Sequence, residues 1–199
     1  MTKLLDELIG NDLSAKRKAL ILRSFELFNK HGFQRVSIEE ICRKAGVSKV
    51  TFYRYFSGKD DLILFIVKTL FDSLLQKSRN ILASEKPIRD KLDGISKLKQ
   101  DLFREMGDEM MQSIMRHQTA SNYLQETFQV SSRIFTEYLS AEQKKGVINP
   151  GVKVELILIL TQELNRLYGE NRFSGLFDSP DELIRQVNEL LWNGLLARG

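Results

Sequence analysis

The 199-residue sequence is poor in the residues that mark disulfide-bonded, metal-binding or catalytic proteins. It has a single cysteine, Cys42, so no disulfide forms within the chain, and only two histidines, His31 and His117. Neither histidine lies in a metal-ligand spacing, and the sequence contains no phosphate-binding glycine loop and no nucleophile elbow. These absences argue against an enzyme and predict neither a metal nor a cofactor.

Long hydrophobic runs are also missing. The longest are residues 62–67 and 156–160, far shorter than the roughly 20 apolar residues that a membrane-spanning helix needs. Asp6 and Glu7 interrupt the apolar N-terminal segment, which therefore does not resemble a signal peptide. We expect a cytoplasmic protein that has no membrane partner.

The small number of helix-breaking residues favours long helices, because the chain contains only 3 prolines and 12 glycines. Ser14, Ser37 and Ser48 stand where helix N-caps are expected, and Gly32 and Gly46 stand where helices should stop. Apolar residues recur at helical spacing between these signals. The sequence therefore predicts an all-α fold of about nine helices, over residues 14–31, 38–45, 49–56, 59–83, 88–106, 108–117, 119–145, 152–169 and 180–197.

Positive charge is concentrated in the first third of the chain. Residues 1–59 hold 12 of the 30 Lys and Arg residues but 6 of the 26 Asp and Glu residues, a net charge of +6. The remaining residues carry a net charge of −2. This asymmetry is typical of a nucleic-acid contact at one end, although a solvated basic surface would show the same pattern.

Residues 37–56 have the pattern of a helix-turn-helix, two short helices joined by a tight glycine-containing turn. Such a unit projects the N-terminal residues of its second helix into the major groove of DNA. Apolar residues at one set of positions can pack the two helices together: Ile38, Ile41, Ala45, Val47, Phe52 and Phe56. The residues left for the outer face of the second helix are Lys49, Val50, Thr51, Tyr53, Arg54 and Tyr55.

The order of these short motifs resembles the TetR/AcrR family of transcriptional regulators over residues 14–66. The matching segments are Gly32-Phe33, residues 36–41, residues 44–49, residues 51–56 and residues 59–62. The resemblance implies a three-helix DNA-binding domain over residues 1–58 and a larger helical domain for ligand binding and dimerisation over residues 59–199. The second part resembles the family only in length and helical character.

The resemblance also implies a role for each matching residue. Ser37 caps the first helix of the motif and touches a phosphate, and Ser48 caps the second. Lys49, Val50 and Thr51 stand where bases are contacted, since lysine donates to guanine and the two methyl-bearing side chains suit thymine. Phosphate contacts are implied for Tyr53, Arg54, Tyr55 and Lys59. Val50 departs from the small residue common at its position, which should alter base preference rather than prevent binding.

A homodimer is implied as well, built from helices over residues 152–169 and 180–197. The first of these is apolar nearly all round, which by itself requires burial on more than one side. The family usually places a small-molecule effector among its middle helices, but no residue of this sequence identifies the ligand. The expected function is a dimeric repressor that binds a palindromic operator in double-stranded DNA and is released by an effector.

One alternative keeps the same DNA-binding surface. A DNA-binding protein with a non-transcriptional protein partner, in cell division or in the nucleoid, would have the same helix-turn-helix. The sequence does not separate these two functions, nor repression from activation.

Overall fold

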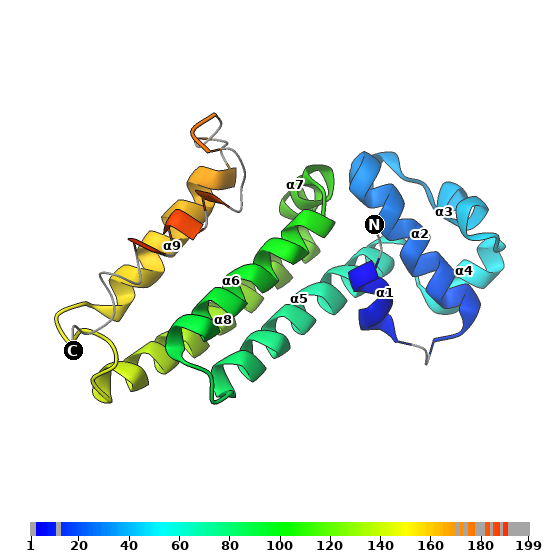
Figure 1. Ribbon diagram of the computed structural model, residues 1–199. Helices are drawn as coiled ribbons and strands as arrows, with labels where there is room; N and C mark the ends of the chain where they lie inside the picture. Colours follow the sequence, from blue (N-terminus) through cyan, green and yellow to red (C-terminus); the bar gives the residue numbers. More distant parts are fainter. Residues whose placement is uncertain are drawn as a thin grey trace. The chain divides into compact units, whose positions relative to one another are not determined.

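The computed structural model describes residues 3–10, 13–169, 172, 175–177, 182–183, 185–187 and 189–190, and is all-helical there apart from turns and loops. No helix of the described residues combines the length and the hydropathy that crossing a membrane requires. The helices in these residues are α1 (Lys3–Ile9), α2 (Ala15–Arg35), α3 (Ile38–Ala45), α4 (Lys49–Tyr55), α5 (Lys59–Ala83), α6 (Ile88–Glu105), α7 (Asp108–Arg116), α8 (Gln118–Lys144) and α9 (Val154–Gly169) (Figure 1).

The chain forms two compact units. Unit 1 comprises residues 1–78 and 98–128, and unit 2 comprises residues 79–97 and 129–199. The long helices α5, α6 and α8 each contribute to both units, since the chain passes from one unit to the other at residues 78/79, 97/98 and 128/129, all within helices. Unit 1 contains the whole predicted helix-turn-helix together with α7, a segment more than fifty residues further along the chain. The boundary predicted between residues 58 and 59 stays a prediction.

Helix α1 was not expected from the sequence. Its seven residues are too few for a helix to be stable alone. Leu5 and Ile9 are nevertheless buried in the hydrophobic core of unit 1, and the Leu4 amide donates to Glu105 Oε1 at 3.0 Å. Packing against the rest of unit 1 therefore stabilises this helix.

The regular part of the first long helix ends where the sequence predicted. Helix α2 is assigned over Ala15–Arg35, but Gly32, directly after His31, has a φ of 71° and a ψ of 172°, which are not helical. The N-cap prediction for this helix was also right, because the Ser14 hydroxyl accepts from the Arg17 amide. Gly32 thus ends the regular helix, and a short segment after the kink leads on to Arg35.

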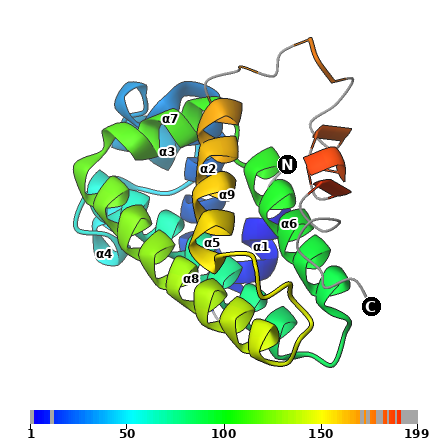
Figure 2. The same ribbon diagram turned by 90° about the vertical axis from the view of Figure 1, so that its left-hand side faces the viewer.

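Polar contacts hold α7 against the kinked end of α2 (Figure 2). Ser113 Oγ of α7 accepts a hydrogen bond from the Phe33 amide at 3.1 Å, a donor next to the kink. The Asn29 side chain of α2 donates to the Glu105 carbonyl at 2.9 Å and accepts from the Gly107 amide at 3.2 Å. One amide of α2 therefore satisfies backbone groups at the end of α6 and the start of α7.

Unit 2 has its own core, made of residues from α6, α8, α9 and the loop before α9. Its fully or nearly buried members are Leu92, Leu139, Ile148, Val154 and Ile157. The opposite side of α9 is apolar but exposed at Leu156, Ile159 and Leu160. The helix predicted over residues 180–197 falls mostly outside the described residues.

Candidate nucleic-acid interface

Both short helices of the predicted helix-turn-helix begin at a serine cap. Ser37 Oγ accepts from the Glu40 amide at 3.2 Å at the start of α3. Ser48 Oγ accepts from the Thr51 amide at 3.2 Å at the start of α4. Each serine satisfies a backbone donor that the first turn of a helix leaves without a partner. The two caps predicted from the sequence are thus confirmed.

The turn between α3 and α4 is closed by a glycine in the left-handed conformation. Gly46 has φ 67° and ψ 35°, and its amide donates to the Arg43 carbonyl at 3.3 Å. The Val47 amide donates to the Cys42 carbonyl at 3.0 Å. These are the two hydrogen bonds of a Schellman motif, which ends α3 sharply and allows α4 to begin at Lys49, three residues after Gly46.

The outer face of α4 is open to solvent where base contacts were predicted. Val50 is 76% exposed and Tyr53 is 55% exposed, and both Lys49 and Arg54 are also exposed. Phe52, on the opposite face, is fully buried in the core of unit 1.

The sequence predicted that Thr51 lies on that outer face, but in the structure it does not. It is only 7% exposed, and its hydroxyl lies 3.1 Å from Ser48 Oγ. Tyr55 is half-buried, with its hydroxyl 2.8 Å from Ser14 Oγ at the start of α2. Thr51 faces inward because the third residue of a helix turns toward its own N-cap. Both residues help to hold α4 in place.

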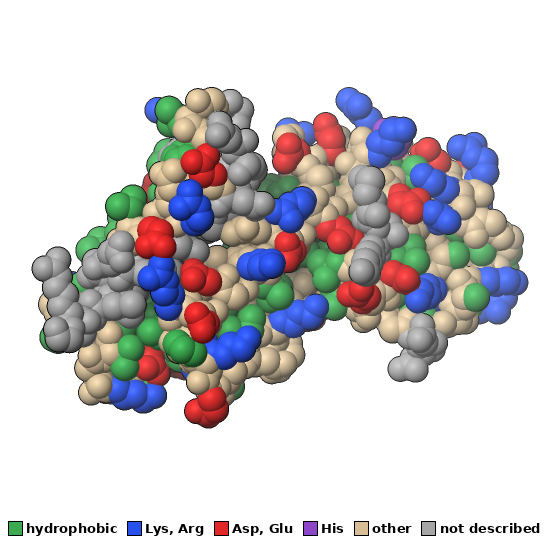
Figure 3. Space-filling view, viewed as in Figure 1, with side chains coloured by type: hydrophobic (Ala, Val, Ile, Leu, Met, Phe, Trp, Pro, Cys, Tyr) green, Lys and Arg blue, Asp and Glu red, His purple; other side chains and the backbone are tan. Residues whose placement is uncertain are grey.

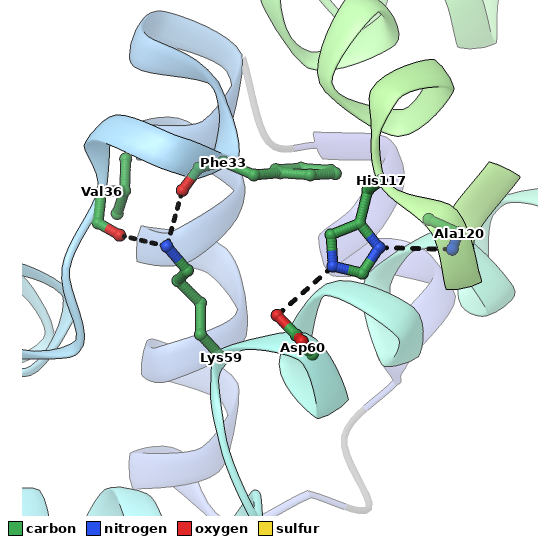
Figure 4. Close-up of polar contacts among 6 residues, drawn as sticks. All are labelled: Phe33, Val36, Lys59, Asp60, His117 and Ala120. Carbon is green, nitrogen blue, oxygen red and sulfur yellow. Dashed lines mark hydrogen bonds and ion pairs between the residues drawn. The ribbon is translucent and has the colours of Figure 1, made fainter.

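Lys59, predicted to contact a phosphate, reaches back to the end of α2. Its ammonium donates to the Phe33 carbonyl at 2.9 Å and to the Val36 carbonyl at 3.0 Å (Figure 4). The segment from Phe33 to Val36 leads directly to the Ser37 cap of α3. One of the three N–H groups of the ammonium is left for another acceptor. Lys59 therefore joins the first turn of α5 to the entry of the helix-turn-helix.

Comparison with known proteins identifies this region. Residues 20–65 match the model of the bacterial regulatory proteins of the tetR family. Residues 20–65 are thus a DNA-binding segment of the TetR family. Two curated relatives are the transcriptional regulator RutR of Escherichia coli strain K12, 33% identical over 60 residues, and the transcriptional activator FasR of Mycolicibacterium smegmatis, 32% identical over 85 residues. These matches cover 30% and 42% of this chain, and 28% and 39% of the relatives' own length.

Solved structures share the fold of this TetR-family chain over nearly its full length. A transcriptional regulator from Saccharomonospora viridis, solved with choline, has a TM-score of 0.75, with 18% identity over 92% of this chain and 98% of that one. The fatty acid degradation regulator FadR from Bacillus halodurans has a TM-score of 0.72, with 18% identity over 94% of this chain and all of that one. The all-α fold predicted from the sequence is thus confirmed.

An ion pair that the sequence did not predict lies at the exposed end of the TetR-family helix-turn-helix. Lys49 Nζ at the start of α4 contacts Glu39 Oε1 in the first turn of α3. The Lys49 hydrogen bond and the amide of Glu39 itself lower the pKa of the Glu39 carboxyl, and the same pairing raises the pKa of Lys49. Burial and the Glu39 charge raise the pKa of the Cys42 thiol. Cys42 itself packs into the hydrophobic core of unit 1.

The surface around these helices carries many basic side chains. Figure 3 shows Lys and Arg side chains over the end of unit 1 that contains α3 and α4. Of the described basic residues there, Arg43, Lys44, Lys49 and Arg54 are exposed. Lys44 is also paired with Glu26 at 3.5 Å. The basic excess counted in the first third of the sequence is therefore presented, at least in part, beside the recognition helix.

His117, isolated in the sequence, lies at a junction in the TetR-family fold (Figure 4). Its Nδ1 accepts from the Ala120 amide at 3.3 Å, and its Nε2 lies 3.3 Å from Asp60 Oδ1 in the first turn of α5. Its ring meets the Phe33 ring edge to face. We assign the neutral tautomer with the proton on Nε2, since that form serves both contacts. His117 thus caps the start of α8 and contacts α5 and α2. The sequence did not predict this role, because Asp60 and Phe33 lie far from His117 along the chain.

Proposed function

We propose that this TetR-family protein is a sequence-specific transcriptional regulator, a homodimeric repressor that binds a palindromic operator and is released by a small-molecule effector. The observation that carries the proposal is the exposed outer face of α4, which presents Lys49, Val50 and Tyr53 from a rigidly capped helix. Base edges are read from such a face, while surrounding groups bind phosphates.

The roles within the interface follow from where the side chains lie. We propose base contacts for Lys49 and Val50, by donation to guanine and by contact with a thymine methyl group. Phosphate contacts are proposed for exposed Tyr53 and Arg54, and for the free N–H of Lys59. Ser48 and Thr51 hold the start of α4. Phosphate contacts are also proposed for the hydroxyls of Ser37 and Tyr55, which cap α3 and contact the start of α2 respectively.

Selection of bound sequences from random duplex DNA by the purified full chain, at a recorded salt concentration, tests the proposal. An enriched palindrome with half-sites about 34 Å apart, or a multiple of that spacing, is the expected result. Weak, salt-sensitive binding without enrichment would contradict a sequence-specific regulator. Enriched sites that lie away from promoters would favour the non-transcriptional alternative.

The Lys49→Ala variant is expected to change the relative ranking of DNA sequences. Loss of a good base contact reduces discrimination at one base pair by about 1–3 kcal/mol. Tyr53→Phe is the matched comparison, since loss of a phosphate contact should weaken binding to all sequences alike. Competition binding with a panel of single-base operator variants measures both effects. An unchanged ranking for Lys49→Ala would refute the base contact.

The apolar side of α9 supports the homodimer. Ile159 is 56% exposed between Leu156 and Leu160, although the other side of the same helix is buried in the core of unit 2. A second copy of the chain would remove this apolar stripe from water. Ile159→Glu is therefore expected to yield a monomer by light scattering at micromolar concentration. Val147→Glu, at another exposed apolar position of unit 2, should leave the mass unchanged.

A lysine on α6 supports an acidic effector. Lys99 stands in the stripe formed by Leu92, Ile95, Leu102 and Met106, which are all buried. Burial lowers the pKa of Lys99, and no described residue forms a hydrogen bond or ion pair with it. A carboxylate or phosphate would supply the missing counter-charge. Release of the selected duplex by a carboxylic acid, but not by its primary amide, would support this class of effector.

A further inference from the structure

The ion pair between Glu39 and Lys49 brings an acceptor and a donor together at the surface that faces DNA in the proposed function. Glu39 comes from the first turn of α3 and Lys49 from the first residue of α4. Both side chains are exposed, 62% and 54% respectively, so the pair is open to a partner rather than enclosed in the protein. Exposed pairs of this kind add little to stability.

The Glu39 carboxylate is paired with the Lys49 ammonium. The hydrogen bond from Lys49, the amide of Glu39 itself and the Ser37 hydroxyl lower the pKa of the carboxyl, which is therefore ionised. Tyr53, one turn further along α4, adds to the electrostatic environment of Lys49. The carboxylate thus stands beside a side chain that the resemblance assigns to base contact.

An ionised carboxylate at this place opposes binding to DNA in general. Non-specific affinity comes almost wholly from cations that neutralise phosphates, and Glu39 cancels the charge of the cation nearest to it. A carboxylate that stays beside the groove is compensated only where a base offers it a donor. The major-groove edge of cytosine offers the N4 amino group, and glutamate is a suitable acceptor for it.

The partner base offers the complementary groups. Guanine presents O6 and N7 as acceptors next to the cytosine amino group, and lysine donates to both atoms. A carboxylate and an ammonium side by side therefore match the donor and acceptors of one G·C pair. We propose that Glu39 is a specificity-determining residue which, together with Lys49, reads a single G·C base pair in each half-site. This inference rests on the proposed DNA-binding function.

Three variants of the full chain test the inference on the duplex selected by the wild-type protein. Glu39→Ala removes the acceptor, and Glu39→Gln removes its charge. Glu40→Gln is the matched control, because it removes the same charge from the neighbouring residue of α3, and no ion pair of Glu40 with a described residue is seen. Circular dichroism and melting temperature establish that each variant is folded.

The expected result concerns one base pair. Replacement of the G·C pair should weaken wild-type binding at least tenfold, and Glu39→Ala should reduce that discrimination to a few-fold. Glu39→Gln should also bind random DNA more tightly, with a salt dependence steeper by about 0.9 for each recognition helix, because Lys49 is then free to neutralise a phosphate. Glu40→Gln should leave the ranking of sequences unchanged.

Two results would overturn the inference, and they are distinguishable. If Glu39→Ala and Glu40→Gln raise the affinity for all sequences by similar factors, Glu39 is only a repulsive charge, while the proposed function stands. If the wild-type protein selects no sequence at all, the proposed function fails and this inference fails with it.

Discussion

The Gly32→Ala variant is expected to lose about 2–4 kcal/mol of its free energy of unfolding. Two effects add together at this position. Gly32 has φ 71° and ψ 172°, a region that is open essentially to glycine alone and costs other residues about 1–3 kcal/mol. A Cβ atom there would also lie 2.6 Å from Ser113 Oγ, so the Ser113 side chain would have to turn away and give up its hydrogen bond from the Phe33 amide. Urea unfolding followed by circular dichroism measures the loss.

Gly46→Ala separates these two effects. Gly46 also has a positive φ, but a Cβ atom at this position would meet no atom within 4 Å. Its cost is backbone strain alone, about 1–2 kcal/mol. If Gly32→Ala proved no more costly than Gly46→Ala, the close approach of α7 to the kink would be disproved.

The Lys59→Met variant is expected to lose both stability and affinity for DNA. Methionine keeps the length of the side chain but removes the ammonium that donates to the Phe33 and Val36 carbonyls. Loss of these charge-assisted hydrogen bonds should lower the free energy of unfolding by about 2–3 kcal/mol. Binding should weaken for all sequences alike, with a salt dependence shallower by about 0.9 for each Lys59.

The control for this variant is Lys30→Met, an exposed lysine of α2 with no predicted contact. It removes the same charge, so it measures the general effect of a lower net charge on DNA affinity. If Lys59→Met lowered DNA affinity but left the unfolding midpoint unchanged, the hydrogen bonds from Lys59 to the Phe33 and Val36 carbonyls would contribute nothing to stability. If it lowered stability alone, the phosphate contact would be refuted.

Local signals explain what the sequence predicted well. The serine caps of α3 and α4 and the glycine that ends α3 act within a few residues, so their patterns can be read directly from the chain. The family resemblance depends on the same short segments. The fold class follows from helical periodicity, which is strong over the long helices α5, α6 and α8.

Long-range contacts explain what the sequence did not predict. Helix α1 depends on the burial of Leu5, and the segment after Gly32 is joined to α7 by the hydrogen bond from the Phe33 amide to Ser113. The hydrogen bonds from Lys59 to backbone carbonyls and the ion pair of Glu39 with Lys49 likewise join residues from different helices. No pattern of neighbouring residues encodes these contacts, so only the folded structure shows them.

The contacts between α2 and α7 also set the order in which the protein can be completed during synthesis. The hydrogen bonds of Asn29 and Phe33 join residues 76 to 80 positions apart along the chain. At about 5–20 residues per second, a ribosome needs roughly 4–16 s to add such a length. The helix-turn-helix therefore emerges well before the segment that secures it, and during that interval the kinked end of α2 lacks its partners. The kinked end of α2 therefore reaches its final structure only after α7 has been made.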